Sequence, residues 1–243
     1  MTTQLPATRN FRKLFLALML IGLATDLGSK YVIFKWLYND SKSETRGVFE
    51  SWTMAKSWRE NRPIFVVGGR YNLVPGWLGL TAEYQPESKP STSLIGALQT
   101  YSAPILPHVN HGALFGLGND HESKDNSERA NTLFAIVSLI AAIAISFWIT
   151  RKSLSGDRWL CAALGLILGG TLGNLYDRIV FGGVRDFLYF YKIEWPVFNV
   201  ADCCLVVGAA MLVLQSFLVP AKSVDVTTTA TVSTPTPNPL AVR

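Results

Sequence analysis

Two aspartates at the mouths of apolar segments are the residues of this sequence with the clearest chemical potential. Asp186 lies in a short aromatic stretch between two long apolar runs, and Asp202 lies near the start of the second run, sixteen positions later (202 − 186). Two carboxyl groups that share a site do not both ionise easily, so one keeps its proton. The ionised carboxylate can then take a proton from water while the other donates one to a carbonyl or a leaving amine. This pair predicts peptide hydrolysis without a metal or a nucleophilic side chain.

Other hydrolytic chemistries have no matching residue set. The only histidines lie in one long polar segment, and the serines near the apolar runs have no histidine beside them. No cluster of His, Cys and carboxylate residues has the spacing of a metal site. We therefore expect no metal ion and no organic cofactor. The cysteines all fall in apolar runs, so they imply no disulfide framework and are interpreted as small core residues: Cys161, Cys203 and Cys204.

Further polar residues at the ends of the apolar runs are candidates to support the site. An ionisable group at such a depth is costly and persists mainly where it has a partner or a function. Asn199 precedes Asp202 by three positions, shares its helix face and could orient a carboxyl group or the scissile amide. Asp26 and Lys30 form an i,i+4 pair within the first apolar run. This pair either neutralises itself or, as we favour, is directed at the site.

The Gly-rich third apolar run combines packing signals with polar residues. Gly165 and Gly169 have the small-xxx-small spacing that lets two helices approach closely. Asn174 and Arg178, one turn apart at the outer end of this run, could face the same site or bind a lipid headgroup phosphate. Asp177 could cap the helix or pair locally with Arg178, and we favour these roles over a catalytic one.

Four apolar runs are each near the roughly 20 residues that a helix needs to cross about 30 Å of hydrocarbon. The predicted fold class is an α-helical membrane protein with four transmembrane helices, a small extracytoplasmic β-rich platform and an amphipathic surface segment. The membrane domain is expected to cover residues 14–219, with spans at about 14–37, 131–150, 159–175 and 197–219.

Basic residues predict the orientation of these spans. One basic cluster at residues 9–13 precedes the first span, and another at residues 151–158 lies in the short link between the second and third. Under the positive-inside rule these segments are cytoplasmic, so both termini lie inside and the loop 38–130 lies outside. The formal net charge of +5 is spread along the chain without a basic patch, so nucleic acid is not an expected partner.

The long outer loop 38–130 must contain structure of its own or disorder. Apolar residues at helical spacing between Val48 and Trp58 predict a short amphipathic helix, either on the membrane surface or packed on the outer part of the protein. Segments rich in β-type residues, separated by turn signals, predict strands. These strands are expected at Ile64–Val67, Arg70–Val74 and Leu78–Ala82, followed by a loose Pro- and Ser-rich insertion at Glu83–Pro107.

The two ends of the chain are expected to lie outside the membrane domain. Residues 1–13 form a short cytoplasmic lead. The basic flank and apolar run that follow are also typical of a secretory signal peptide with cleavage after Ala24. Apolar and aromatic residues resume at Tyr31, however, and make the run long enough to remain as a helix. Residues 220–243 are dominated by Thr, Pro, Val and Ala and predict a disordered cytoplasmic tail.

Five short blocks, in this order and together with the four-span layout, resemble the lipoprotein signal peptidase family, also called signal peptidase II. The last three blocks are specific as a set. The resemblance covers the spans and the segments near them. The blocks are TDLGSK (Thr25–Lys30), VNHGALFG (Val109–Gly116), GGTLGNLYDR (Gly169–Arg178), GGVRDF (Gly182–Phe187) and FNVAD (Phe198–Asp202).

This resemblance implies an intramembrane aspartic endopeptidase of the bacterial cytoplasmic (inner) membrane, with its active site toward the outer leaflet. It would remove the signal peptide from diacylglyceryl-modified prolipoproteins just before the lipidated cysteine. Its partners would be these lipid-modified substrates and membrane lipids. Asp186 and Asp202 would be the catalytic pair. The residues that would support the site, the substrate or the helix packing are Asp26, Lys30, Asn110, Gly169, Asn174, Arg178 and Asn199.

Two features depart from the family pattern, and other functions stay open. Leu27 stands where the family usually has Gln, which affects the polar network around Asp26. The outer segment is longer than usual, through additions at Asn39–Gly69 and Glu83–Pro107.

A small transporter would show charges spread through the membrane depth or internal repeats, and a presenilin-type protease would show Gly-x-Gly-Asp. An inactive relative that acts as a binding scaffold is the other alternative.

Overall fold

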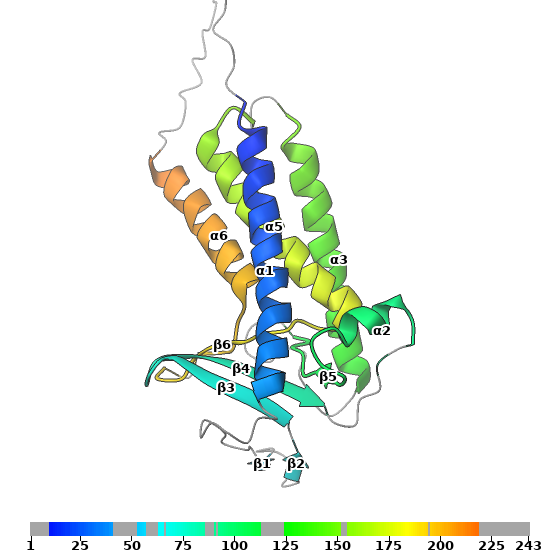
Figure 1. Ribbon diagram of the computed structural model, residues 1–243. Coiled ribbons are helices and arrows are strands. Elements are labelled where there is room, and N and C mark those ends of the chain that lie inside the picture. Colours follow the sequence, from blue (N-terminus) through cyan, green and yellow to red (C-terminus); the bar gives the residue numbers. More distant parts are fainter. Residues whose placement is uncertain are drawn as a thin grey trace, which may run out of the picture.

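Four long helices form a bundle with a small sheet at one end (Figure 1). All four are long and apolar enough to cross a membrane, which confirms the predicted fold class. The helices are α1 (Arg12–Asp40), α3 (Lys124–Trp148), α5 (Arg158–Phe181) and α6 (Val200–Leu218). The computed structural model describes residues 10–40, 53–56, 63–65, 67–85, 90, 92–112, 124–151, 155–193 and 195–218.

Helix α5 is the central and most buried of the four spans. Its glycines explain how closely it packs. A Cβ atom on Gly165 would lie 2.6 Å from the carbonyl oxygen of Phe15 in α1, and one on Gly169 would lie 2.7 Å from that of Met19. A separate glycine, Gly170, faces α6. The small residues therefore let the backbones of neighbouring helices come into direct contact with α5.

Replacing Gly165 with alanine is expected to destabilise the bundle by about 1–3 kcal/mol, because the added methyl group must push α1 away from α5. The matched control is Gly28→Ala in α1, where a Cβ atom meets nothing within 4 Å. That control should be neutral or stabilise the helix by up to about 1 kcal/mol. Thermal unfolding in detergent compares the two. Equal midpoints would contradict close packing at Gly165.

Two helix ends beside the candidate site differ from the sequence prediction, and helix α3 also begins seven residues before the predicted start at 131 (131 − 124). Helix α5 continues to Phe181, six residues beyond the predicted end at 175 (181 − 175), and stops at Gly182, whose φ of 72° is left-handed. Asn174 and Arg178 therefore lie inside the helix. Helix α6 begins at Val200, three residues after the predicted start at 197 (200 − 197), so Asp202 sits in its first turn. Hydropathy falls where polar residues begin, but the backbone stays helical because those polar side chains find partners within the protein.

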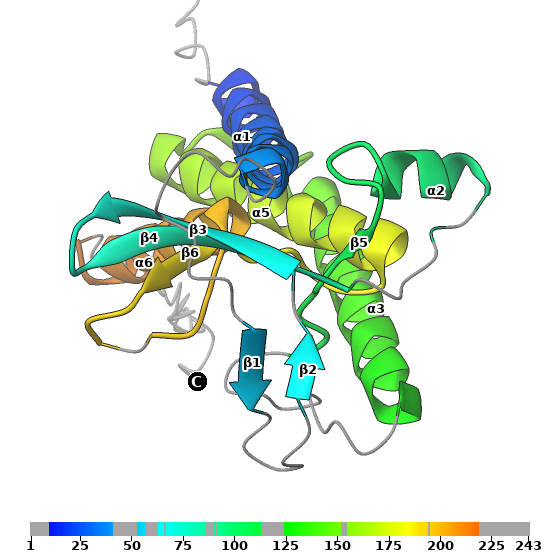
Figure 2. The same ribbon diagram turned by 60° about the horizontal axis from the view of Figure 1, so that its bottom comes forward.

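Strand β4 (Leu78–Gln85) is the centre of the four-stranded sheet. It pairs antiparallel with β3 (Val67–Val74) through a turn at Gly76, where φ is 77°. Its beginning pairs with β6 (Leu188–Phe190), and its end pairs with β5 (Leu106–Pro107). Figure 2 shows β6 alongside β4, so the sheet ties the loop after α5 to the hairpin that follows α1.

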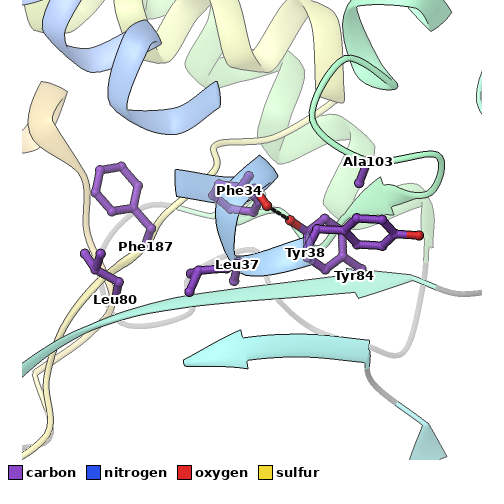
Figure 3. Close-up of a cluster of buried hydrophobic side chains, with 8 residues drawn as sticks. Phe34, Leu37, Tyr38, Leu80, Tyr84, Ala103 and Phe187 are labelled. Carbon is purple, nitrogen blue, oxygen red and sulfur yellow. Dashed lines mark hydrogen bonds between the residues drawn. The ribbon is translucent and has the colours of Figure 1, made fainter. Parts of the chain in front are cut away.

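Two apolar cores lie on either side of a polar centre along α1. One joins α1, α3 and α5 at the end away from the sheet and includes Phe15. The other joins the end of α1 to the sheet, where the Tyr84 hydroxyl donates to the carbonyl oxygen of Phe34 (Figure 3). The buried members of this sheet-end core are Phe34, Leu37, Tyr38, Leu80, Ala82, Tyr84, Ala103 and Phe187.

Two predictions for the outer loop are wrong. Within the predicted amphipathic helix, the described residues Thr53–Lys56 form strand β1, which pairs with β2 (Pro63–Phe65). The rest of that segment lies outside the described residues. The segment Glu83–Pro107, predicted to be loose, continues β4 to Gln85 and then forms helix α2 (Leu94–Gln99) and strand β5. Tertiary contacts with α1 and α5 order this segment, and its composition alone does not reveal them.

Candidate active site

The motif Asn199-Val200-Ala201-Asp202 forms a reciprocal cap at the start of α6. The backbone N–H of Asp202 donates to Asn199 Oδ1 at 3.0 Å, and the backbone N–H of Asn199 donates to Asp202 Oδ2 at 3.1 Å. This is a capping-box arrangement, which satisfies two backbone donors that a helix start would otherwise leave free. The carboxylate of Asp202 is therefore held at the positive end of the α6 dipole.

The loop that carries Asp186 is fixed by backbone hydrogen bonds on both sides. Before it, Val184 exchanges two hydrogen bonds with Asn110, at 2.8 and 2.9 Å. After it, Phe187 donates its N–H to the carbonyl oxygen of Phe198 at 3.0 Å and accepts from the N–H of Thr81 in β4 at 2.8 Å. The sheet and the segment before α6 thus position Asp186, although the residue itself is in no helix.

Two asparagine amides hold the Asp186 carboxylate. Asn199 Nδ2 donates to Asp186 Oδ1 at 2.7 Å, and Asn110 Nδ2 donates to Asp186 Oδ2 at 3.1 Å. The Asn110 Oδ1 atom accepts the N–H of Gly112 at 3.0 Å, so this Asn-x-Gly turn orients the amide toward Asp186. Asn199 contacts Asp186 through its side chain and Asp202 through its backbone, and it therefore links the two carboxylates.

Lys30 is fully buried at the centre of a polar cluster next to these carboxylates. Its Nζ atom lies 2.7 Å from Asp26 Oδ2 and 3.3 Å from Asp177 Oδ2. The other oxygen of Asp26 accepts the N–H of Ala201 at 2.9 Å, which links α1 to the start of α6. The predicted Asp26–Lys30 pair is therefore present, and it is directed into the bundle toward the other candidate residues.

Asn174 connects Lys30 to Asp202. Its Oδ1 atom accepts from Lys30 Nζ at 3.1 Å and from Asn199 Nδ2 at 3.2 Å. An ammonium group donates only, so the atom facing Lys30 must be the amide oxygen. This leaves Asn174 Nδ2 to donate to Asp202 Oδ1 at 2.9 Å. The buried charge of Lys30 thereby determines which end of the amide faces Asp202.

Sequence reasoning missed Arg185, the partner of Asp177. Both side chains are buried, and Arg185 donates to Asp177 through its backbone N–H at 2.9 Å and through Nη2 at 2.8 Å. The guanidinium also lies 3.9 Å from the ring centroid of Phe181 and 4.3 Å from that of Tyr31. Arg185 immediately precedes Asp186 in the chain. The sequence prediction paired Asp177 with Arg178, but the hydrogen bonds to Asp177 come from Arg185 instead.

The buried cluster is balanced in charge, with two cations (Lys30 and Arg185) and two anions (Asp26 and Asp177). A buried charge is tolerated when it is paired and hydrogen-bonded. The signal that could have identified Arg185 was its position as an ionisable residue directly beside a candidate catalytic one, in a segment otherwise rich in aromatic residues.

Asp186 and Asp202 open onto one cavity of about 1160 Å³. Asn174 and Arg178 also line it. Arg178 lies with its guanidinium 5.5 Å from the ring centroid of Phe134, and its buried Nε atom has no hydrogen-bond partner among the described residues. Gly169 does not reach the cavity and instead lies at the contact between α5 and α1. Residues Ala113–Gly116 of the predicted second block lie outside the described residues.

Apolar residues of two spans line part of the cavity. Helix α3 contributes Phe134 and Val137, and helix α6 contributes Leu205 and Val206. Val137 and Val206 are exposed on the surface of the bundle, where lipid would contact them. Polar residues of the sheet, Thr81 and Glu83, also line the cavity. Apolar residues of two spans and polar residues of the sheet thus line the same cavity as the two carboxylates.

The pKa of Asp186 is raised to about 7, first by burial of the carboxyl group and second by the negative charge of Asp202. Hydrogen bonds from Asn110 and Asn199 oppose this rise in pKa because they favour the charged form. Asp186 therefore holds a proton more readily than an ordinary carboxyl group at neutral pH. The titration belongs to the interacting pair.

The fold and the site together define a multi-pass membrane protein with two aspartates at a cavity beside the bilayer. The sequence model of the family described as signal peptidase (SPase) II matches residues 89–218, more than half of the chain. The chain belongs to the signal peptidase II family.

Curated relatives agree with this assignment, and a solved structure shares the fold. A lipoprotein signal peptidase of Polynucleobacter necessarius is 42% identical over 113 residues, which cover 45% of this chain and 68% of the relative. One of Pseudomonas aeruginosa is 44% identical over 96 residues, covering 38% and 56%. The matched stretches thus span about half to two-thirds of these relatives. A solved structure described as a bacterial membrane enzyme shares the fold, with a TM-score of 0.53 and 19% identity over 86% of this chain and 91% of that one.

Proposed function

We propose that this protein is an intramembrane aspartic endopeptidase that removes the signal peptide from diacylglyceryl-modified prolipoproteins, cleaving before the lipidated cysteine. The family supports a signal peptidase acting on lipoproteins. The observation that carries the aspartic mechanism is that Asp186 and Asp202, linked by Asn199, line the same cavity. The setting is the bacterial inner membrane, with both termini cytoplasmic and the site toward the outer leaflet.

The reaction uses the pair in its singly protonated form. The ionised carboxylate accepts a proton from a water molecule as the water oxygen attacks the scissile carbonyl carbon, and the protonated carboxyl donates to the carbonyl oxygen. The resulting tetrahedral intermediate collapses when Asp202 passes the proton that it took from water to the amide nitrogen, a hydroxyl of the intermediate returns a proton to Asp186, and the C–N bond breaks to give a carboxylic acid and an amine. Asp186 is the member that carries the proton before attack, because its pKa is raised to about 7.

The hydrogen-bond network holds both carboxylates in a fixed orientation for the proton transfers. Every oxygen of the pair accepts one N–H, from Asn110, Asn174 or Asn199. These donors cannot lose their protons near neutral pH, so they orient the carboxylates without competing in the proton transfer. Preorganised donors of this kind lower the reorganisation that the transition state needs. The remaining lone pairs of the oxygens are free for water and substrate.

The cavity suits a substrate that carries both a peptide and acyl chains. Its wall between α3 and α6 is apolar and exposed to lipid, so a signal helix and a diacylglyceryl group can enter from the bilayer. The peptide around the scissile bond would lie against the sheet-side polar residues, beside Asp186 and Asp202. Acyl chains that remain in hydrocarbon need not be transferred to water, which would cost about 0.8 kcal/mol per CH₂ group.

Cleavage of a lipidated substrate by the reconstituted full-length protein tests this proposal. The wild type in lipid bilayers should convert a diacylglyceryl-modified prolipoprotein to the shorter form, seen as a gel shift and located by mass spectrometry. A matched substrate with the same sequence but no lipid on the cysteine should be cleaved far more slowly. Cleavage of both at equal rates would reject lipid specificity, and cleavage of neither by folded protein would favour a non-catalytic role.

The activity should fall as pH rises above about 7. The active form needs one proton on the pair, and loss of the proton from Asp186, whose pKa is about 7, removes the general acid. Above that point kcat/KM should drop about tenfold for each pH unit. A pH profile of the initial cleavage rate measures this alkaline limb, which is the fall in rate above about pH 7.

Asn110→Ala should move the same limb to higher pH. The hydrogen bond from Asn110 stabilises the ionised form of Asp186, so its removal raises the pKa of that carboxyl further. The rate itself should also fall because Asp186 loses one of its two amide donors. A slower enzyme with an unmoved alkaline limb would show that Asp186 does not set this limb.

A further inference from the structure

The segment from Thr92 to Ile105 has an unusual composition for a connection between a sheet and a helix. It contains no Asp, Glu, Lys or Arg. Several of its apolar side chains point outward: Leu94 is 79% exposed, Tyr101 is 65% exposed and Ile95 is 43% exposed. The segment lies within one of the two stretches that make this outer loop longer than the family usually shows. An exposed apolar group of this kind marks an interaction surface.

This segment is held firmly against the membrane helices. The Tyr31 hydroxyl in α1 donates to the carbonyl oxygen of Leu98 at 3.2 Å, and Ser102 Oγ donates to the carbonyl oxygen of Tyr31 at 3.0 Å. Gln99 Nε2 donates to the carbonyl oxygen of Val180 in α5 at 2.7 Å. Three hydrogen bonds to two different spans therefore fix helix α2 and the residues after it.

These contacts place the segment at the depth of lipid-facing residues of the spans. Next to Val180, the side chain of Ile179 is 63% exposed, and next to Tyr31 that of Val32 is 66% exposed. In Figure 1, α2 lies beside the lower end of α5, on the span side of β3 and β4. The segment is thus bonded to the spans at positions whose chain neighbours expose apolar side chains.

A cation marks the edge of this surface. The Nζ atom of Lys35 in α1 lies 5.0 Å from the ring centroid of Tyr101. One residue further along α1, Trp36 is half-exposed and packs edge-on against Tyr71 of the sheet. Lysine, tryptophan and tyrosine side chains gather where hydrocarbon meets the headgroups. Tyr101 therefore lies at that boundary, and Leu94 and Ile95 belong to the same uncharged stretch.

We propose that Thr92–Ile105 is an interfacial membrane anchor, whose exposed side chains Leu94, Ile95 and Tyr101 are embedded in the phospholipid leaflet on the sheet side. In that position the apolar side chains contact acyl chains, and the Tyr101 hydroxyl reaches the headgroup region. Because the same segment is bonded to Tyr31 and Val180, it braces the sheet-side ends of α1 and α5 against the bilayer surface. This role is independent of peptide cleavage.

Fluorescence quenching from two sides tests the anchor in the full chain reconstituted in phosphatidylcholine–phosphatidylglycerol vesicles. Ile95→Cys is made in a background in which Cys161, Cys203 and Cys204 are alanine, and the new thiol is labelled with bimane. Tyr101→Cys is a second reporter. One quencher is a phospholipid with a nitroxide on its acyl chain, and the other is iodide in water. Ile140→Cys, on the exposed face of α3, is the lipid-facing reference, and bimane-labelled glutathione is the aqueous reference.

The anchor predicts that the lipid nitroxide quenches the label at residue 95 to a degree similar to that at residue 140. Iodide should quench it at least about threefold less than the glutathione conjugate, because hydrocarbon excludes the ion. The label at residue 101 should respond partly to both quenchers. Strong quenching by iodide without quenching by the lipid would overturn the proposal in favour of a water-facing surface. Protection from both quenchers would overturn it in favour of contact with another protein chain.

Discussion

Asp186→Asn and Asp202→Asn should each reduce cleavage of the lipidated prolipoprotein by about 10²- to 10⁴-fold. An asparagine keeps the shape of the side chain but cannot accept the proton of the attacking water or donate one at the right step. Each variant should still fold, because the donors stay in place: Asn110 and Asn199 beside residue 186, and Asn174 and the backbone N–H of Asn199 beside residue 202. Single-turnover rates in lipid, with the melting temperature measured alongside, give the comparison.

The double variant should be about as slow as either single variant. The two carboxylates work in one proton exchange, so losing the second costs little once the first is gone. Asp157→Asn is the matched control. Asp157 caps the start of α5 at the other end of the bundle, accepting the N–H of Trp159 at 2.8 Å, and asparagine caps a helix equally well. That control should retain full activity.

Loss of cleavage in Asp177→Asn alone, with both candidate variants still active, would move the catalytic role to Asp177. The structure gives a reason to expect otherwise. Asp177 is fully buried, does not line the cavity and has its oxygens occupied by Arg185. Its replacement should therefore lower the stability of the fold before it affects the chemistry.

Lys30→Met should destabilise the protein by about 3–5 kcal/mol, the usual cost of removing one partner of a buried ion pair. The ammonium group is fully buried between Asp26 and Asp177, and without it Asp26 has no cation within ion-pair distance among the described residues. Methionine fills most of the volume, so the loss comes from charge and hydrogen bonding and not from a large cavity. Chemical unfolding in a mixed-micelle system measures the change in free energy.

Lys30→Met should also reduce cleavage, through Asn174. Without the Nζ donor, the amide of Asn174 loses one of the two hydrogen bonds that keep its oxygen away from Asp202. The double variant Lys30→Met/Asp26→Asn separates the loss of stability from the loss of cleavage. It removes the uncompensated carboxylate but does not restore the Nζ donor to Asn174. We expect it to recover part of the stability and little of the activity. Full recovery of both would contradict a role for Lys30 in orienting Asn174.

The sequence by itself determined the four spans and the nature of the polar centre. Hydrophobicity is a property of each segment, so an apolar run such as 131–150 identifies a span without knowledge of its neighbours. The same holds for the motif at Asn199–Asp202, whose two polar side chains cap the helix that they begin. The family blocks around Asp186 and Asp202 also indicated that these residues would meet, and the structure brings both to one cavity.

The tertiary structure alone decided the partners of the buried charges and the arrangement of the outer loop. Arg185 turns back to Asp177 because α5 continues to Phe181 and then reverses at Gly182, and hydropathy placed the end of that helix too early. The segment around α2 is ordered by hydrogen bonds to Tyr31 and Val180, which lie far from it in the chain. Such pairings depend on which helix faces come together. Local composition and spacing do not determine which helix faces pack together, so only the folded chain reveals these pairings.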